Sequence, residues 1–214
     1  MYQLLKAVDN EIIHRDIKPS NIMFDNNGVL KLIDYGCARV DITQLDEYKD
    51  AIDEQFGTEK YEVKYSLEVG TRWYKAPEML LGSKTYDKSI DIWAIGCIFA
   101  ELLAMKPFFK GINDIEQIVM IIKTFGTPND ETWPEFKQLP DYPKLIFPDQ
   151  DGIDLNEHFP DHDTSTIEFL KRFLVLNPKH RISISDALND VFFDDVDLTD
   201  MKDKNSQDPS TESS

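Results

Sequence analysis

Four polar residues near the start of the chain combine the side-chain types that phosphoryl transfer requires. Asp16, Lys18 and Asn21 lie in the stretch HRDIKPSN (14–21), and Asp34 opens the stretch DYG (34–36). The reaction needs a carboxylate near the attacking hydroxyl, a cation on the transferred phosphoryl group and oxygen ligands that hold Mg²⁺ on the phosphates. Taken singly, each of these residues is an ordinary polar loop residue, but together they point to a phosphoryl-transfer site.

Three motifs that follow one another in the chain resemble the signatures of the protein kinases. HRDIKPSN resembles their catalytic loop, DYG their metal-binding motif with Tyr35 in place of the usual phenylalanine, and APE (76–78) the end of their activation segment. The resemblance covers residues 1–193 and implies a mainly α fold, the carboxyl-terminal lobe of a kinase domain with a short β-hairpin at the catalytic loop. It also implies ATP and Mg²⁺ as cofactors and γ-phosphate transfer to serine or threonine of protein substrates.

The same resemblance gives each chemical residue a role. Asp16 resembles the base that orients the substrate hydroxyl, and Lys18 the cation that touches the γ-phosphate. Asn21 and Asp34 resemble the two magnesium ligands. Met23 is expected beneath the adenine ring, although plain core packing also suits a methionine.

Motifs further along resemble the cyclin-dependent kinase branch. They are TRWYKAPE (71–78), FGTPN (125–129) and LPDY (139–142), and the last points to the cell-cycle-related kinase and the kinase that activates other cyclin-dependent kinases. The branch implies proline-directed protein substrates (Ser/Thr-Pro) and a cyclin or other activating subunit as partners. In the mitogen-activated branch, the alternative within the kinases, a Thr-x-Tyr phosphosite would end where this chain has Glu68.

Thr71 is a third candidate catalytic residue beside Asp16 and Lys18, and three other residues are expected to support the site rather than to react. By resemblance, Thr71 bridges Asp16 and Lys18 by hydrogen bonds. Glu78 and Arg181 resemble a buried ion pair that fastens the activation segment to the lobe, and Asp91 resembles the carboxylate that braces the catalytic-loop backbone.

Ser66 occupies the place of the branch's activating phosphate, a short distance before Thr-x-Trp-Tyr. Arg15 and Arg39 match two of the three arginines that bind this phosphate, and an arginine cluster suits a group with a charge near −2. The alternative is that Ser66 is a solvated loop residue. Gly70 sits where the branch needs a backbone turn that opens a pocket for proline, and Lys75 replaces the usual arginine there, which predicts a looser pocket.

The chain lacks the elements with which a kinase covers ATP from above. It contains no glycine-rich loop, no strand lysine paired with a helix glutamate and no hinge, so we expect the amino-terminal lobe to be missing and the chain to be inactive by itself. Two hypotheses follow: part of an active serine/threonine kinase, or a non-catalytic kinase-lobe interaction module. The presence of all four chemical residues favours the first.

Local patterns predict the elements that position these residues. Asn26-Asn27-Gly28 between two apolar runs predicts a hairpin of strands at 22–25 and 29–33. The remaining elements are expected to be helices, with capping boxes at Asn113/Glu116 and Ser165/Glu168. The expected helices are 1–13, a buried central helix at 89–104, 113–125, 165–177 and 183–193. Residues 128–162 are expected to be ordered but irregular.

Composition limits the partners and the compartment. The 214 residues carry a net charge of −17 with a pI near 4.5, which disfavours nucleic acid and anionic membrane surfaces as partners. Cys37 and Cys97 have no pairing or metal-ligand spacing, so we expect an intracellular protein of the cytoplasm or nucleus. The acidic segment 40–63 is expected to form a mobile loop, and the tail 194–214 to be disordered.

Overall fold

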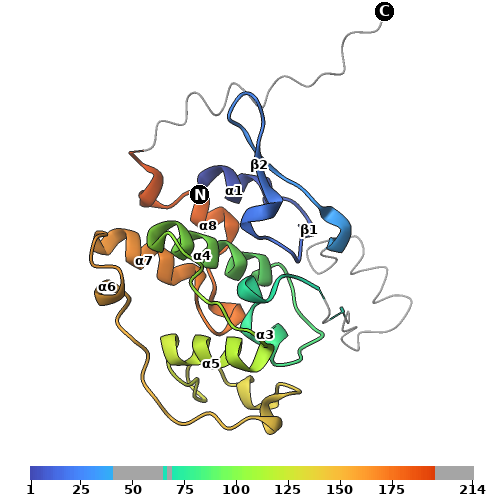
Figure 1. The fold of residues 1–214 in the computed structure, drawn as a ribbon, viewed down its shortest axis with the longest axis vertical. Coiled ribbons are helices and arrows are strands. Elements are labelled where there is room, and N and C mark those ends of the chain that lie inside the picture. Colours follow the sequence, from blue (N-terminus) through green and yellow to red (C-terminus); the bar gives the residue numbers. More distant parts are fainter. Residues whose placement is uncertain (41–64, 67–68, 196–214) are drawn as a thin grey trace, which may run out of the picture.

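The computed structural model describes residues 1–40, 65–66 and 69–195, and the described part is mainly helical (Figure 1). Helix α4 (Ser89–Ala104) runs through its centre and is buried on all sides from Ile90 to Ala100. Helix α7 (Thr164–Phe173) packs against it through edge-on contacts of Phe99 with Phe169 and Phe173. The predicted central helix and its bounds are therefore confirmed. The helix is buried on all sides because its surface is apolar all round.

The predicted hairpin is also confirmed. Strands β2 (Ile22–Phe24) and β3 (Leu30–Leu32) pair antiparallel, and Gly28 takes the left-handed conformation (φ 75°) that the turn needs. The Asp25 side chain accepts from the backbone N–H of Asn27 and Val29 and closes the turn. The hairpin lies directly after the short helix η1 (Pro19–Asn21), so it fixes one end of the catalytic loop.

The first helix is shorter than predicted. Helix α1 (Tyr2–Ala7) ends where the polar pair at positions 9 and 10 interrupts the apolar run, and the Asn10 side chain accepts from the N–H of Ile12. Residues Ile12–Ile13 form strand β1, which pairs antiparallel with β4 (Arg39–Val40). The expected helix over 1–13 is thus wrong at its end, because a partner strand 27 positions away is invisible in the local pattern.

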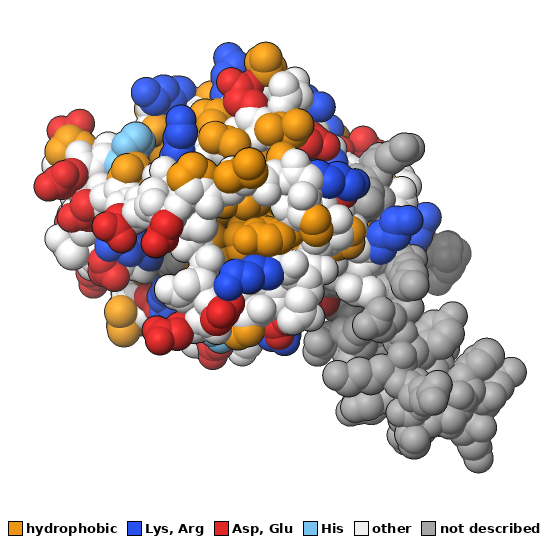
Figure 2. All heavy atoms as spheres, turned by 90° about the horizontal axis from the view of Figure 1, so that it is seen from below, with side chains coloured by type: hydrophobic (Ala, Val, Ile, Leu, Met, Phe, Trp, Pro, Cys, Tyr) orange, Lys and Arg blue, Asp and Glu red, His pale blue; other side chains and the backbone are white. Residues whose placement is uncertain are grey.

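Helix α5 (Asp114–Phe125) begins at the predicted capping residue. Asn113 accepts from the N–H of Glu116 at 2.8 Å, and Glu116 in turn accepts from the N–H of Ile112 at 2.7 Å. After α5, the irregular excursion contains three single-turn elements: η5 (Phe136–Gln138), η6 (Tyr142–Lys144) and α6 (Leu155–His158). Figure 2 shows hydrophobic side chains near the middle of this face, with acidic and basic side chains interspersed around them.

The capping box predicted at Ser165 is wrong. Asp163 caps α7 by accepting from the N–H of Thr166 at 2.8 Å, and the Ser165 hydroxyl donates to the same carboxylate. A carboxylate accepts both donors at once, which a hydroxyl does less well. Glu168 forms an ion pair with Lys171 instead.

The carboxyl-terminal elements are also more divided than predicted. Helix α7 ends at Phe173, four residues before the Asn-Pro pair, and a single helix at 183–193 is replaced by two elements. Asp190 caps the second of them and so separates it from the first. The two elements are α8 (Ile184–Leu188) and η8 (Val191–Phe193). The short helix η7 (Pro178–His180) precedes them.

Two predicted segments, the acidic loop at 40–63 and the tail at 194–214, lie outside the described residues except for positions 40, 194 and 195. Within the described part of the chain, no helix is long and apolar enough to cross a membrane.

Candidate active site

Asp16 is the centre of a hydrogen-bond network on the catalytic loop. Lys18 Nζ donates to Asp16 Oδ2 at 2.7 Å and to Thr71 Oγ1 at 2.9 Å. The backbone N–H and the hydroxyl of Thr71 donate to Asp16 Oδ1 at 2.8 and 2.9 Å. The structure therefore brings these three predicted residues together, although Thr71 lies 55 positions after Asp16.

Asn21 closes the network from the other side. Its Nδ2 donates to the Asp16 backbone carbonyl at 2.8 Å and, more weakly, to Asp16 Oδ2 at 3.3 Å. This contact points the amide nitrogen toward Asp16 and leaves the Asn21 Oδ1 oxygen without a hydrogen bond from any described residue.

Burial and hydrogen bonding act on Asp16 in opposite directions. Burial alone would raise the pKa of the carboxyl, but hydrogen bonds from Lys18 and Thr71 outweigh it and lower the pKa below its ordinary value. Asp16 is therefore an ionised hydrogen-bond acceptor at neutral pH.

His14 is a neutral support beneath the loop. Burial lowers its pKa, and Nε2 lies 3.1 Å from the Ile33 carbonyl while Nδ1 faces the N–H of Asp16. A neutral ring with the proton on Nε2 satisfies both contacts. Asp16 and Asp34 both act on the His14 ring electrostatically, so the ring lies near both carboxylates.

Asp91 on α4 holds the backbone of the catalytic loop. Its two carboxylate oxygens accept from the N–H groups of His14 (2.7 Å) and Arg15 (2.9 Å), and the side chain is buried. Arg15 has a φ of 68°, a conformation that side-chain-bearing residues rarely adopt. These two hydrogen bonds hold the loop in a turn that its own sequence would not favour.

Asp34 is exposed and is hydrogen-bonded to the N–H of Gly36 at 3.4 Å, with a left-handed φ of 64°. No hydrogen bond joins it to Asn21 or Asp16. Among the described residues there is no group of three or more His, Cys, Asp and Glu that could hold a metal by itself. An amide oxygen and a carboxylate nevertheless fit Mg²⁺, which commonly takes one or two protein oxygens and completes its shell with waters and phosphates.

The expected adenine-side residue lies on the hairpin surface. Met23 on β2 is 52% exposed, and its neighbour Phe24 is 66% exposed. Met23 is thus not a core residue in this chain, and its thioether is accessible to a ligand.

The structure brings the three residues of the predicted phosphosite only partly together. Arg15 Nη1 donates to the Tyr86 hydroxyl at 3.1 Å, and that hydroxyl donates to the Ser66 carbonyl at 2.8 Å. The structure therefore links Ser66 to Arg15 through Tyr86. Arg39 is exposed and donates to the Ala38 carbonyl, so its guanidinium is not joined to Ser66 by a hydrogen bond.

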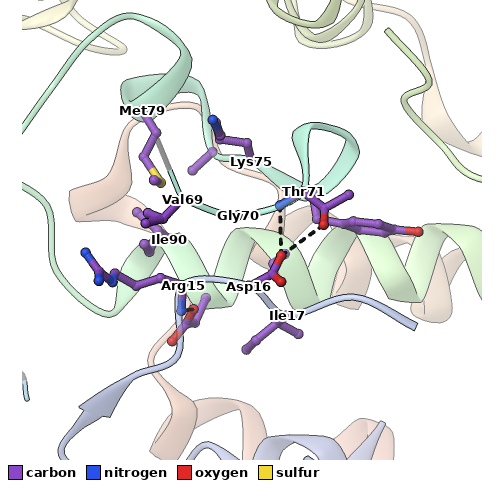
Figure 3. A pocket seen from close by; sticks show the side chains of 13 residues that line it. Arg15, Asp16, Ile17, Val69, Gly70, Thr71, Lys75, Met79 and Ile90 are labelled. Carbon is purple, nitrogen blue, oxygen red and sulfur yellow. Dashed lines mark hydrogen bonds between the residues drawn. The ribbon is translucent and has the colours of Figure 1, made fainter. Parts of the chain in front are cut away.

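A small pocket opens beside Asp16 (Figure 3). One wall is the backbone at Gly70, whose φ of 83° and distance to the Arg15 carbonyl leave no room for a side chain: an added Cβ would lie 2.7 Å from that oxygen. Lys75 lines the pocket together with apolar side chains. The apolar lining residues are Ile17, Val69, Ala76, Met79, Ile90 and Ala94.

Glu78 and Arg181 form a bidentate ion pair with both N···O distances at 2.7 Å. Both side chains are almost completely buried, and the remaining guanidinium donors bond to the carbonyls of Val175, Leu176 and Ser89. The pair joins α3 (Pro77–Leu80) to the loop before α8.

Sequence reasoning missed Tyr86. It lies outside every motif, and only the folded chain places its hydroxyl between Arg15 and Ser66. Local sequence carried no signal for this contact, because Tyr86 is 20 positions from Ser66 and 71 from Arg15.

Comparison with known proteins gives one family match and several relatives. Residues 1–193 match the family model of the protein kinase domain. The chain is 42% identical over 197 residues to cyclin-dependent kinase 20 of Danio rerio and 40% identical to that of Homo sapiens. Each alignment covers 90% of this chain but 53% and 52% of the relative, so the chain spans about half the length of the curated relatives it matches.

Solved structures agree with this match. The yeast RNA Pol II CTD kinase complex CTDK-1 contains a chain that superposes with a TM-score of 0.75 at 30% identity, over 92% of this chain and 61% of that one. The CAK complex of Chaetomium thermophilum bound to ATP-gamma-S gives a TM-score of 0.76 at 30% identity, over 91% and 56%.

Proposed function

The chain belongs to the protein kinase family, and we propose that it is the catalytic-loop half of a serine/threonine kinase of the cyclin-dependent type. The observation that carries the proposal is the convergence of Asp16, Lys18, Asn21 and Thr71 into one hydrogen-bond network. A non-catalytic module has no chemical use for this arrangement.

In the proposed reaction, Asp16 accepts a hydrogen bond from the substrate hydroxyl and orients it. The carboxylate already accepts four hydrogen bonds, from Thr71 twice and from Lys18 and Asn21. A carboxylate has about four acceptor positions. A substrate hydroxyl must therefore displace a donor, and Lys18 would leave most readily because a phosphate attracts its ammonium group more strongly than one carboxylate does.

ATP and Mg²⁺ follow from the family, and the donors present fit them. Asn21 Oδ1 and the exposed carboxylate of Asp34 would hold the metal, and Met23 would lie beneath the adenine. Magnesium neutralises charge that develops on the phosphates.

The pocket beside Asp16 supports proline-directed specificity. Its apolar side chains, together with the backbone turn that Gly70 makes at its wall with a φ of 83°, suit a small apolar ring next to the acceptor residue. Lys75 carries one point charge where a guanidinium would offer a fork of donors, so the pocket is expected to discriminate less sharply.

Ser66 is the proposed site of an activating phosphate that Arg15 and Arg39 would bind. The similarity to cyclin-dependent kinases, together with the CAK complex as a structural neighbour, supports a cyclin or other activating subunit as a partner. It also supports an intracellular location and disfavours the mitogen-activated alternative.

The chain alone is expected to be inactive. Positioning and electrostatic stabilisation supply most of phosphoryl-transfer catalysis, and the chain spans about half of its relatives. The alternative function is a non-catalytic interaction module that binds substrates or regulators without turnover.

The decisive experiment joins an amino-terminal lobe from a cyclin-dependent kinase to this chain and measures phosphate transfer to a Ser-Pro peptide. We expect activity that Asp16→Asn lowers by about 10² to 10⁴-fold, while Asp9→Asn, an exposed carboxylate paired with Lys6, leaves it unchanged. A folded but inactive chimera would favour the interaction module.

A further inference from the structure

Arg15 carries a buried positive charge without an anionic partner. Arg15 is 5% exposed. Its guanidinium donates to the Cys37 carbonyl at 2.6 Å and to the Tyr86 hydroxyl at 3.1 Å. In the part of the chain that the structure describes, no carboxylate forms an ion pair with it. Buried charges in proteins are normally paired, so this position suits an added anion.

Ser66 is docked beside this cation by contacts with residues 84–86. The N–H of Tyr65 donates to the Lys84 carbonyl at 2.7 Å, and the rings of Tyr65 and Tyr86 stack at 4.9 Å. The Tyr86 hydroxyl donates to the Ser66 carbonyl at 2.8 Å. The Arg15 guanidinium also lies 5.8 Å from the centre of the Tyr65 ring. The Ser66 backbone is therefore linked to Arg15 through Tyr86 in the unmodified chain.

A phosphate could bind Arg15 without displacing Tyr86. A guanidinium has five N–H donors, and the described residues accept from two of the donor nitrogens, Nε and Nη1. The Nη2 group is left for an anion. Arg39 also acts electrostatically on Tyr86, so a second positive charge contributes at this hydroxyl. Burial raises the pKa of Tyr86, which keeps its hydroxyl a neutral donor.

We infer that Tyr86 is a positioning residue for the modification of Ser66: its hydroxyl joins Arg15 to the Ser66 backbone and so preorganises the phosphate-binding site. The inference rests on the proposed phosphosite at Ser66 and adds to it a residue that acts through Arg15 rather than on the phosphate itself. Preorganisation strengthens phosphate binding because the side chains that contact the phosphate are already ordered before it is present.

The test uses the full chain with and without phosphoserine at position 66, and measures the rise in melting temperature that the phosphate causes. We expect a rise of about 3 to 6 °C in the unsubstituted chain, as one or two charge-assisted hydrogen bonds would give. Tyr86→Phe should reduce this rise to less than half. Tyr74→Phe, which removes another hydrogen-bonded hydroxyl, from Glu101, should lower both melting temperatures and preserve their difference.

A second variant covers the case in which Tyr86→Phe does not fold. Tyr65→Leu removes the ring that stacks on Tyr86 and lies over the Arg15 guanidinium, but it keeps the hydrogen bond from Arg15 to the Cys37 carbonyl. This variant should also halve the rise in melting temperature. Phosphorus NMR adds a readout that general destabilisation does not move: the phosphoserine pKa should be lower in the unsubstituted chain than in either variant. A full rise in a folded variant overturns the role of Tyr86 alone. No rise in the unsubstituted chain overturns the phosphosite itself, and this inference with it.

Discussion

At the scale of single residues, the polar groups of the catalytic loop satisfy one another before any ligand is bound. Lys18 neutralises Asp16, and Thr71 bonds to both. This arrangement explains why an acid and an amine can lie together in a partly buried site without a large penalty. A phosphate group would therefore have to replace existing hydrogen-bond partners, such as those of Lys18, because Lys18 is already bonded to Asp16 and Thr71.

Asp91 is the residue at which burial and function conflict most strongly. Burial raises the pKa of its carboxyl to about 6, although two backbone N–H groups favour the charged form. The ionised Asp91 carboxylate therefore lowers the stability of the folded chain at neutral pH. It also accepts from the N–H of Arg15 and so holds the backbone there at its positive φ.

This conflict predicts a specific pH dependence. Because the folded pKa of about 6 lies above the ordinary 3.8, the contribution of Asp91 to stability is complete below pH 3.8 and is lost as the pH rises through 6. Urea unfolding should show that the free energy of unfolding of the unsubstituted chain, minus that of Asp91→Asn, falls by about 2 kcal/mol between pH 4 and 7. The lowered pKa of His14 affects both proteins and cancels. A difference that stays constant with pH would contradict this account.

At the scale of elements, the sequence predicted those that local signals define. The hairpin at Asn27-Gly28, the central helix and the cap at Asn113 all depend on neighbouring residues. The pairing of β1 with β4 and the bridge from Arg15 through Tyr86 depend on residues far away in the chain, so no local pattern revealed them. At the start of α7, Asp163 and Ser165 are both suitable capping residues, so the local sequence does not distinguish them. In the structure, Asp163 is the N-cap.

The ion pair between Glu78 and Arg181 is the main polar link between the activation segment and the carboxyl-terminal elements. Both side chains are 4% exposed or less. Glu78→Gln leaves a buried guanidinium without its counter-ion and should destabilise the chain by about 3 to 5 kcal/mol. Glu135→Gln, which breaks an exposed pair with Lys179, should leave the denaturation midpoint unchanged. Equal effects of the two substitutions would refute the role of burial.

At the scale of the whole molecule, the hairpin side exposes large apolar side chains. Phe24 on β2 is 66% exposed and Tyr35 on η2 is 44% exposed, and both adjoin residues of the proposed nucleotide site; Val40 on β4 is 50% exposed. An apolar surface of this kind is typical of an interface.

Substituting Phe24 should therefore change surface properties without changing stability. We expect Phe24→Ser to reduce binding of a hydrophobic dye while the melting temperature stays within about 2 °C, since little apolar area is buried there. Phe109→Ser, at a site that is 2% exposed, should instead unfold the chain or lower its melting temperature strongly. Unchanged dye binding in Phe24→Ser would show that this surface is already covered.

The central claim is that Asp16, Lys18, Asn21 and Asp34 form one site for a metal-bound triphosphate. Amide NMR of the chain with substoichiometric Mn²⁺ and ATP tests it directly, because the paramagnetic ion broadens signals of nearby residues even when binding is weak. We predict broadening centred on residues 16–21 and 34–36 that disappears in Asn21→Ala/Asp34→Ala but persists in Asp130→Ala, which removes an exposed carboxylate paired with Lys137. Broadening that is identical in the double variant, or centred elsewhere on the acidic surface, would contradict the claim.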